Sequence, residues 1–295
     1  MRSVGLSDKI FSIVVGSLVI MTFIIMVYPL LFVVSASFSD PVLVLAGKVG
    51  LFPKGFNIKS YVTVFQEPDV YTGYKNTIIY TTVGTAVNII MTTLGAYPLS
   101  RKKFYGKNLF TAMLAFTMIF NGGLIPKYMV IKQLGLVNNF WVMIIPDAIQ
   151  MWNLVIMRTF FQKNIPDEIY DAAMIDGCSN IRVLKSIVIP LSKSIFAVMV
   201  LFYAVSHWNS FFTALIYLTD ERKYPLQIFL RRILIQNQYT EGLINTSGES
   251  AAERMFAAEG MKYSLIIISS LPILILYPFI QKYFVKGVMI GAIKG

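Results

Sequence analysis

Charged residues are scarce in this chain: 14% of its 295 residues are Asp, Glu, Lys or Arg, whereas 56% are hydrophobic. A soluble domain carries about 25% charged residues, so the mean hydropathy of +0.65 excludes an ordinary soluble protein. The single cysteine, Cys178, excludes an internal disulfide and a cysteine-based metal cluster. The single histidine, His207, excludes a His-rich metal site, and we expect it to pack in the interior or at an interface.

The sequence also lacks the G-x-x-x-x-G-K-[ST] loop, whose backbone amides hold phosphates. Gly47-Lys48 and Gly106-Lys107 each lack both the upstream glycine and the following Ser or Thr. The chain is therefore not expected to hydrolyse ATP by itself. Its few titratable side chains form no recognisable catalytic constellation, so we expect no enzyme, no catalytic residue and no resident metal.

Six hydrophobic stretches carry little or no charge. A bilayer core of about 30 Å needs about 20 apolar residues in a helix, and a helix satisfies its own backbone in lipid. The first stretch follows Arg2 and Lys9 like a signal peptide, but it is longer than the 7–15 residues of a signal-peptide core, so we expect a retained helix. The sequence predicts an all-α membrane protein with six transmembrane helices, over residues 10–39, 76–100, 108–126, 138–157, 194–219 and 263–281.

Basic residues predict the orientation of these helices. The short turn between the second and third stretches contains Arg101, Lys102, Lys103 and Lys107, and short loops rich in Lys and Arg stay in the cytoplasm. Six spans then place both termini in the cytoplasm. The segment between the fourth and fifth stretches also lies inside. The expected location is a cell membrane, which is bacterial if the motif described next is what it resembles, and the net charge of +11 is explained by this flanking pattern rather than by nucleic-acid binding.

That inner segment contains a motif with fixed spacing. Asp171-Ala172-Ala173 is followed after three residues by Gly177, and after nine more by residues 187–190, which read Ile-Val-Ile-Pro. This resembles the coupling loop of ABC-importer permeases, whose pattern is E-A-A, three residues, G, nine residues, then I-x-L-P. The two departures are Asp171 for Glu and Ile189 for Leu. An ordinary amphipathic loop would not be expected to keep this spacing.

The resemblance implies a function and partners. Such a permease pairs with a second permease subunit, two ATP-binding subunits that hold ATP and Mg, and an extracytoplasmic sugar-binding protein. The coupling loop, residues 167–190, docks on the ATPase as short helices joined by a sharp turn, which glycine permits. The shorter Asp side chain at position 171 reaches less far than Glu. The implied ATPase-docking residues are Asp171, Ala172, Ala173, Asp176, Gly177 and Pro190.

The resemblance covers nearly the whole chain and is strongest from Asn76 onward. The segments 96–101, 208–215 and 224–227 resemble permeases of the maltose-permease-like carbohydrate group. The segments 121–126 and 277–287 are similar to its oligosaccharide subgroup, which includes lipo-oligosaccharide-type permeases. We therefore expect an oligosaccharide importer. The expected division is a first helix with an external loop (1–75), a five-helix permease core (76–285) and a cytoplasmic tail (286–295) that reaches the ATPase pair or frays.

Five polar or aromatic residues inside the spans are candidates for the translocation path. Asp147 lies near the midplane of the fourth stretch, about nine residues from its start, and it is expected either to line the path or to bond a neighbouring helix or subunit. Amide and aromatic groups suit sugars but also serve helix packing. The candidates are Asn121, Asp147, Gln150, Trp208 and Asn209.

Two other functions are considered. A self-sufficient secondary transporter often has two similar halves, and no inverted repeat is visible here. A polytopic membrane enzyme would need the catalytic residues that are missing. Co-purification of an ATPase separates the permease from both alternatives.

Overall fold

The computed structural model describes residues 6–243 and 249–292, and every secondary-structure element in these ranges is helical. This confirms the predicted all-α class. The chain divides into two compact units, Met1–Val70 with Leu230–Leu271, and Tyr71–Phe229 with Pro272–Gly295.

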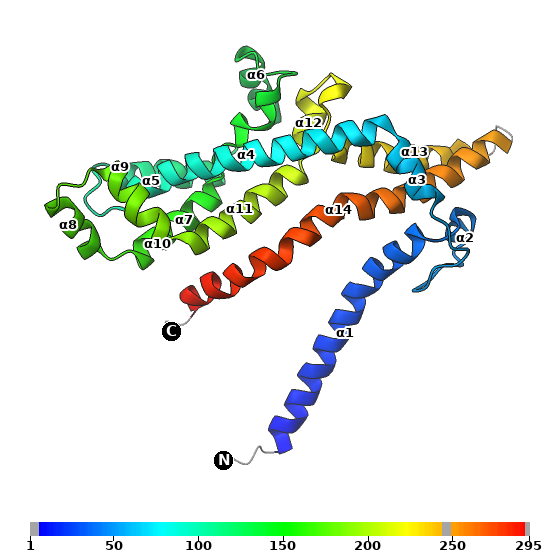
Figure 1. Ribbon diagram of the computed structural model, residues 1–295, viewed down its shortest axis with the longest axis horizontal. Helices are drawn as coiled ribbons and strands as arrows, with labels where there is room; N and C mark the ends of the chain where they lie inside the picture. The colour runs from blue at the N-terminus through cyan, green and yellow to red at the C-terminus, as the bar shows by residue number, and fades with distance from the viewer. Residues whose placement is uncertain (1–5, 244–248, 293–295) are drawn as a thin grey trace. The chain divides into compact units, whose positions relative to one another are not determined.

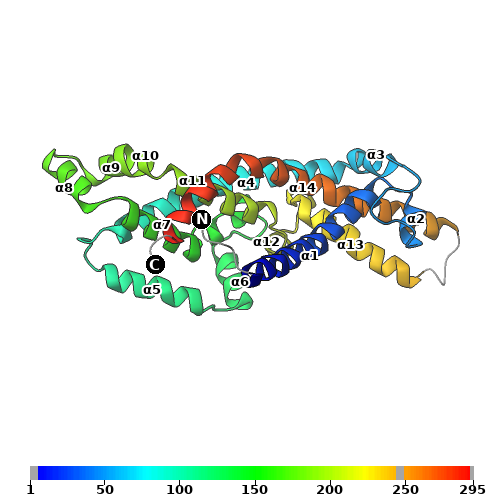
Figure 2. The same cartoon turned by 90° about the horizontal axis from the view of Figure 1, so that it is seen from below.

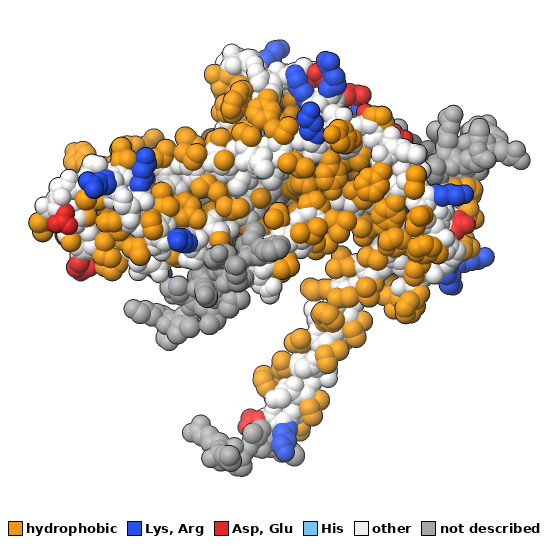
Figure 3. All heavy atoms as spheres, in the orientation of Figure 1, with side chains coloured by type: hydrophobic (Ala, Val, Ile, Leu, Met, Phe, Trp, Pro, Cys, Tyr) orange, Lys and Arg blue, Asp and Glu red, His pale blue; other side chains and the backbone are white. Residues whose placement is uncertain are grey.

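The first unit contains α1 (Leu6–Ser37), α2 (Pro41–Leu45) and α3 (Lys59–Gln66). Hydrophobic side chains cover the exposed length of α1 (Figure 3), and Ile20, Phe23 and Ile24 are each more than half exposed. A helix that is apolar on all sides is suited to lipid. The hydroxyls of Ser12 and Thr22 donate to carbonyl oxygens four residues back, both at 2.8 Å, so α1 satisfies its own polar groups.

The second unit is built around α4, a 33-residue helix. The remaining helices of this unit follow in chain order, and α13 (Leu226–Leu243) and α14 (Glu249–Ala292) carry residues of both units. They are α4 (Pro68–Ser100), α5 (Lys107–Ile119), α6 (Leu124–Gln133), η1 (Phe140–Met143), η2 (Ile145–Asp147), α7 (Met151–Asn164), α8 (Asp167–Ile175), α9 (Asn180–Val183), the π-helical η3 (Leu184–Val188), α10 (Ile189–Leu191), α11 (Lys193–Trp208), α12 (Phe212–Tyr217) and η4 (Glu221–Lys223).

The largest core of the second unit joins four of these helices. Ala96 of α4, Phe161 of α7 and Tyr203 of α11 are fully buried together, and Leu114 of α5 packs against them. At one end of this bundle, the short helices α8, α9 and α10 form a projection, of which α8 stands out farthest (Figures 1 and 2). Charged side chains of both signs gather on that projection (Figure 3).

Three helices of the described residues are long and apolar enough to cross a membrane: Ser7–Ser37, Pro68–Ser100 and Ala258–Pro278. Three more pairs of helices meet the same test only when each bent pair counts as one span. The expectation of continuous helices over 108–126, 138–157 and 194–219 is wrong, because α5 ends at Ile119, η2 ends at Asp147 and α11 ends at Trp208, all inside these stretches.

Local sequence explains two of the interruptions. After α5, Gly123 adopts a φ of +87°, and the chain turns by 116° before α6. Pro146 lies in the 3₁₀ turn η2, and a 51° bend follows before α7. Glycine reaches positive φ without steric cost, and proline lacks the N–H that a continuous helix needs.

The C-terminal part is more continuous than expected. The sixth expected span and most of the predicted tail belong to the single helix α14, which begins at Glu249 and ends at Ala292. Glycine costs only about 1 kcal/mol relative to alanine inside a helix, so Gly287 and Gly291 do not terminate one that a long apolar run precedes. Residues 293–295 of the predicted tail lie outside the described residues.

Candidate functional site

The motif at residues 171–190 folds as short helices joined by a tight turn. α8 ends at Ile175, and the N–H of Gly177 donates to the carbonyl of Met174 at 3.1 Å. Gly177 has a φ of +73°, and no atom lies within 4 Å of the position of an added Cβ. The Ser179 hydroxyl then caps α9 by accepting from the N–H of Arg182. The geometry that the sequence predicted for this glycine is therefore present.

The other motif residues differ in exposure. Asp171, Ala172, Asp176 and Gly177 are exposed, whereas Ala173 is 5% exposed and belongs to the core of its own chain. Ala173 is thus small because it packs internally, and it cannot present a surface to another subunit as expected. Pro190 is exposed at the first turn of α10.

Three basic residues at the end of α4 hold α8 in place. Lys102 pairs with Asp167 at 2.6 Å and Lys103 pairs with Asp171 at 2.9 Å. The guanidinium carbon of Arg101 lies 3.2 Å from the centroid of the Tyr170 ring. The hydrogen bond from Lys102 holds the pKa of Asp167 below its ordinary value. These contacts connect the projecting helix directly to α4.

A cavity of about 560 Å³ lies between α4, the basic turn and α8. Its walls come from α4, the basic turn, α8 and the segment after it, and they are mostly apolar. Residues on its lining include Leu94, Arg101, Phe104, Met174 and Ile181.

Polar side chains form a buried row along α4 in the interior of the second unit. Asn88 is fully buried, and its amide donates to the backbone oxygen of Asp147 at 2.7 Å. The Asn88 Oδ1 atom lies 2.6 Å from Nε2 of His207, and because an amide oxygen only accepts, Nε2 carries the proton. One turn further, the hydroxyls of Thr92 and Tyr203 are 2.6 Å apart. The lone histidine is packed, as expected.

Asp147 has a partner that the sequence analysis did not identify. Its Oδ1 atom accepts from Nζ of Lys127 at 3.0 Å. Asp147 lies in η2, ahead of α7, and not in the middle of a continuous helix. Gln150, at the start of α7, donates to the Ser206 hydroxyl and accepts from Asn153, both at 3.1 Å. The expectation that the carboxylate pairs with a neighbouring helix is met by α6 of the same chain.

The remaining path candidates lie apart from this cluster. Trp208 is buried and its ring contacts that of Tyr74 edge-on, with the centroids 5.9 Å apart. Asn209 is exposed and donates to the Val205 carbonyl, where it caps α11. Asn121 is exposed and accepts from the N–H of Gly123 in the turn before α6. All three have roles in the local structure.

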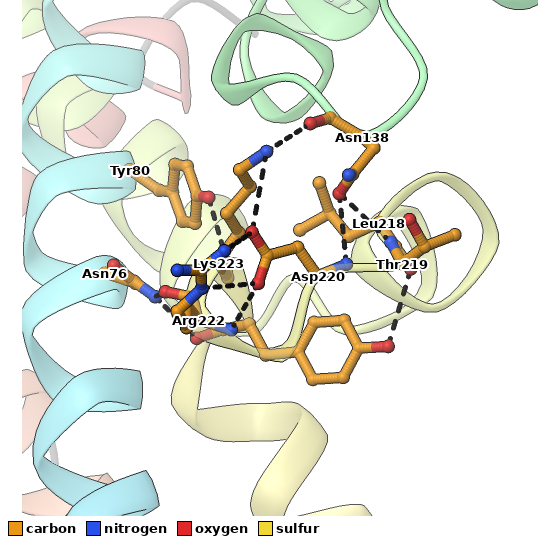
Figure 4. Close-up of polar contacts among 9 residues, drawn as sticks. Asn76, Tyr80, Asn138, Leu218, Thr219, Asp220, Arg222 and Lys223 are labelled. Atoms are coloured by element: carbon orange, nitrogen blue, oxygen red, sulfur yellow. Dashed lines mark hydrogen bonds and ion pairs between the residues drawn. The ribbon is translucent and has the colours of Figure 1, made fainter.

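A second polar cluster, which no sequence motif revealed, fixes the other end of α4 (Figure 4). Asn138 has a φ of 56°, and its Oδ1 atom accepts from the N–H groups of Thr219 and Asp220. Lys223 donates to the Asn138 carbonyl at 2.6 Å, and the Tyr80 hydroxyl donates to the Lys223 carbonyl at 2.9 Å. The turn before η4 is thereby attached to both α4 and the segment after α6.

Several residues of these clusters were not predicted. Lys127 follows directly after the expected third span, and only its charge next to an apolar segment could have drawn attention to it. Asn88 and Ser206 are ordinary polar residues within apolar runs. No distinctive spacing identified them.

No family model matches the chain. It is 41% identical to Protein LplC of Bacillus subtilis (strain 168), over 92% of this chain and 90% of that protein. It is 36% identical to the polygalacturonan/rhamnogalacturonan transport system permease protein YtcP of the same organism, over 98% of this chain and 100% of that protein. A solved bacterial ABC transporter involved in the import of the acidic polysaccharide alginate matches with a TM-score of 0.85 and 32% identity, covering 96% of this chain and 100% of the matched chain.

Proposed function

Because this chain belongs to the permease subunits of binding-protein-dependent carbohydrate ABC importers, we propose that it forms half of the translocation path of an importer for acidic oligosaccharides. The identity of 41% over 92% of the chain carries the family assignment. The relatives are transport permeases, which fits a protein that is not an enzyme. Membership of this family implies partner ATPase subunits and a substrate-binding protein. It does not support the alternative of a self-sufficient secondary transporter.

The proposed topology has six spans, with both termini in the cytoplasm. Three continuous helices and three bent pairs supply six candidates. The basic turn at Arg101–Lys103 and the α8–α10 projection lie at the same end of the second unit, as the ion pairs between them require. Basic short loops favour the cytoplasmic side. A second permease of similar build completes the path.

The α8–α10 projection is proposed to dock on the ATPase. Ala172, Asp176 and Gly177 are exposed there together with the apolar Ile175, which is 86% exposed. The basic turn holds this projection against α4, so a displacement of α8 is carried to a helix of 33 residues. The Asp171 carboxylate accepts a hydrogen bond from Lys103 of its own chain. In the proposed complex it would contact both Lys103 and the ATPase. The tail beyond Lys286 extends α14, and we place it near the ATPase pair.

The proposed cargo class rests on what two relatives are named for. Polygalacturonan and alginate are both polymers of uronic acids, which carry one carboxylate per sugar residue, and the alginate transporter is described as acting on an acidic polysaccharide. Of the five residues proposed for the path, Asp147 and Gln150 have the strongest support, because the side chain of each bonds a polar side chain of another helix. Asn121 and Asn209 are exposed and therefore accessible to a substrate. Trp208 is buried, which argues against direct contact between its ring and the sugar.

The test is reconstitution of this chain with its partner ATPase, second permease and binding protein. The complex in proteoliposomes should import a labelled oligogalacturonide only with internal ATP. A chain that transports without a co-purified ATPase would refute the permease assignment. Uptake of neutral oligosaccharides alone would refute the acidic cargo.

A further inference from the structure

The ion pair between Lys127 and Asp147 lies level with the middle part of α4. The Asn88 amide bonds the Asp147 backbone, so the depth of Asn88 along α4 gives the depth of the pair. At 1.5 Å per residue, Asn88 is about 20 Å from Arg101. A hydrocarbon core of about 30 Å that begins at the basic turn has its centre within about 5 Å of Asn88.

Both side chains are about half exposed at this depth: Lys127 is 47% and Asp147 is 50% exposed. A charged side chain that faces lipid at the helix centre is costly on insertion scales. Two such charges, even when paired, are therefore expected to face water or protein rather than lipid. Intramembrane ionisable groups of this kind mark substrate or ion pathways.

Neutral polar side chains lie on the segment that follows Asp147 and on its partner in α11. Gln150 follows Asp147 by three residues and bonds the exposed Ser206 as well as Asn153. Amides and hydroxyls of this kind can exchange hydrogen bonds with sugar hydroxyls. The protein thus offers one ammonium group together with several neutral hydrogen-bonding groups. A uronate residue carries the matching groups, namely one carboxylate and several hydroxyls.

We propose that Lys127 is a binding residue for the carboxylate of the passing sugar. This inference rests on the proposed acidic cargo. The ammonium has three N–H donors, and its only hydrogen bond among the described residues goes to Asp147, which leaves donors for a ligand. Charge-assisted hydrogen bonds to a carboxylate are roughly twice as strong as neutral ones.

Asp147 competes with the substrate carboxylate for the ammonium group of Lys127. In the empty path it neutralises Lys127, and when a substrate carboxylate arrives it shares the ammonium. A transport site must bind well enough to admit its cargo yet weakly enough to release it. Asp147 keeps the binding weak, so its removal strengthens binding and slows release.

The experiment compares two substrates that differ only in charge: an oligogalacturonide and its methyl ester, both tested with the reconstituted complex. Lys127→Gln should raise the KM for the acid about ten-fold or more, from the loss of a charge-assisted bond, and should leave the KM for the ester within about two-fold of wild type. Lys127→Arg should restore most of the preference for the acid. Asp147→Asn should lower both KM and the maximal rate for the acid.

The matched control is Lys132→Gln, a second exposed lysine of α6 for which the described residues provide no ion-pair partner. Its kinetics should equal those of the wild type. If the wild type does not import the acid, the proposed acidic cargo is refuted, and the proposed role of Lys127 is refuted with it. Wild-type import of the acid with an unchanged KM in Lys127→Gln would overturn this inference.

A second measurement separates a path from a subunit interface. Lys127→Cys in a Cys178→Ser background should react with a water-soluble thiol reagent in the assembled complex, and the oligogalacturonide should slow the reaction. Protection that depends on the second permease and not on the sugar would assign the ion pair to the interface and overturn the inference.

Discussion

At the scale of single residues, Gly84 allows the imidazole of His207 to lie directly against α4. A Cβ atom at Gly84 would overlap the imidazole ring, which is held in place by Asn88. The ring cannot withdraw without breaking this hydrogen bond inside the unit. One missing methyl group thus permits the polar contact between α4 and α11.

We predict that Gly84→Ala destabilises the protein by about 1–3 kcal/mol, the usual cost of overpacking a core. The apparent Tm of the detergent-solubilised complex should fall. Gly16→Ala is the control, because Gly16 is a helical glycine of α1 with no atom within 4 Å of an added Cβ. Equal Tm values for the two variants would contradict the close contact.

At the scale of elements, the turn after α8 combines a positive φ with open space. Gly177 and Gly135 both have positive φ, +73° and +68°, and an added Cβ at either meets nothing within 4 Å. Large side chains at these two positions therefore carry a similar backbone cost and do not disturb internal packing. The two turns differ in location, since one joins α8 to α9 and the other follows α6.

We predict that Gly177→Trp leaves the protein inserted in the membrane but separates ATP hydrolysis from transport, because the indole occupies the proposed docking face. Gly135→Trp should insert to the same extent and remain coupled. The measurement is the ratio of sugar imported to ATP hydrolysed in proteoliposomes. Normal coupling in Gly177→Trp would remove the docking role of this turn.

Two ion pairs join the basic turn to α8, Lys102 with Asp167 and Lys103 with Asp171. We predict different effects on coupling when the two charges of each pair are exchanged. Lys102→Asp alone should lower coupling, and the double variant Lys102→Asp/Asp167→Lys should restore it, because Asp167 is only required to hold α8. The exchange of Lys103 with Asp171 should not restore coupling if Asp171 also contacts the ATPase. Full rescue by both exchanges would leave Asp171 with a purely internal role.

The ion pair between Lys102 and Asp167 should be insensitive to pH in the neutral range. The pKa of Asp167 is lowered by its bond to Lys102, so its contribution is fully present above the unfolded value of about 4 and is lost only as the pH falls through the lower folded pKa. The pKa of Lys102 is raised by the same bond, which preserves the pair at alkaline pH. Coupling by the wild type should therefore not vary between about pH 6 and 8 on account of this contact.

At the scale of the whole molecule, the topology determines which end of the second unit meets ATP. We predict that reporter fusions after Lys107 and after Lys163 are cytoplasmic, because both follow or adjoin the basic turn and the α8 projection. A fusion after Asp220 should be external, at the opposite end of α4. An external signal at Lys163 would overturn the orientation and the docking assignment together.

The C-terminal helix provides the last prediction. Because α14 continues to Ala292, deletion of residues 289–295 removes a helical turn on the proposed ATPase side. We expect lower ATPase activity in the assembled complex with normal insertion. Unchanged ATPase activity and transport would support a tail with no contact to the ATPase.

The sequence by itself determined the all-α membrane class, the family and the geometry of the turn at Gly177. These follow from local properties: apolar runs of sufficient length, a fixed motif spacing and the freedom of glycine at positive φ. It also predicted that Asp147 would need a partner, since an isolated charge is costly at that depth.

Only the tertiary structure decided where that partner lies and which motif residues face outward. Lys127 is 20 residues from Asp147, and the 116° bend before α6 brings the two together. Ala173 and Ala172 are identical in type, yet only Ala173 is buried, because the position of α8 against α4 selects the inner face. Bends and packing faces depend on contacts between distant segments, and a linear pattern of residue types does not contain them.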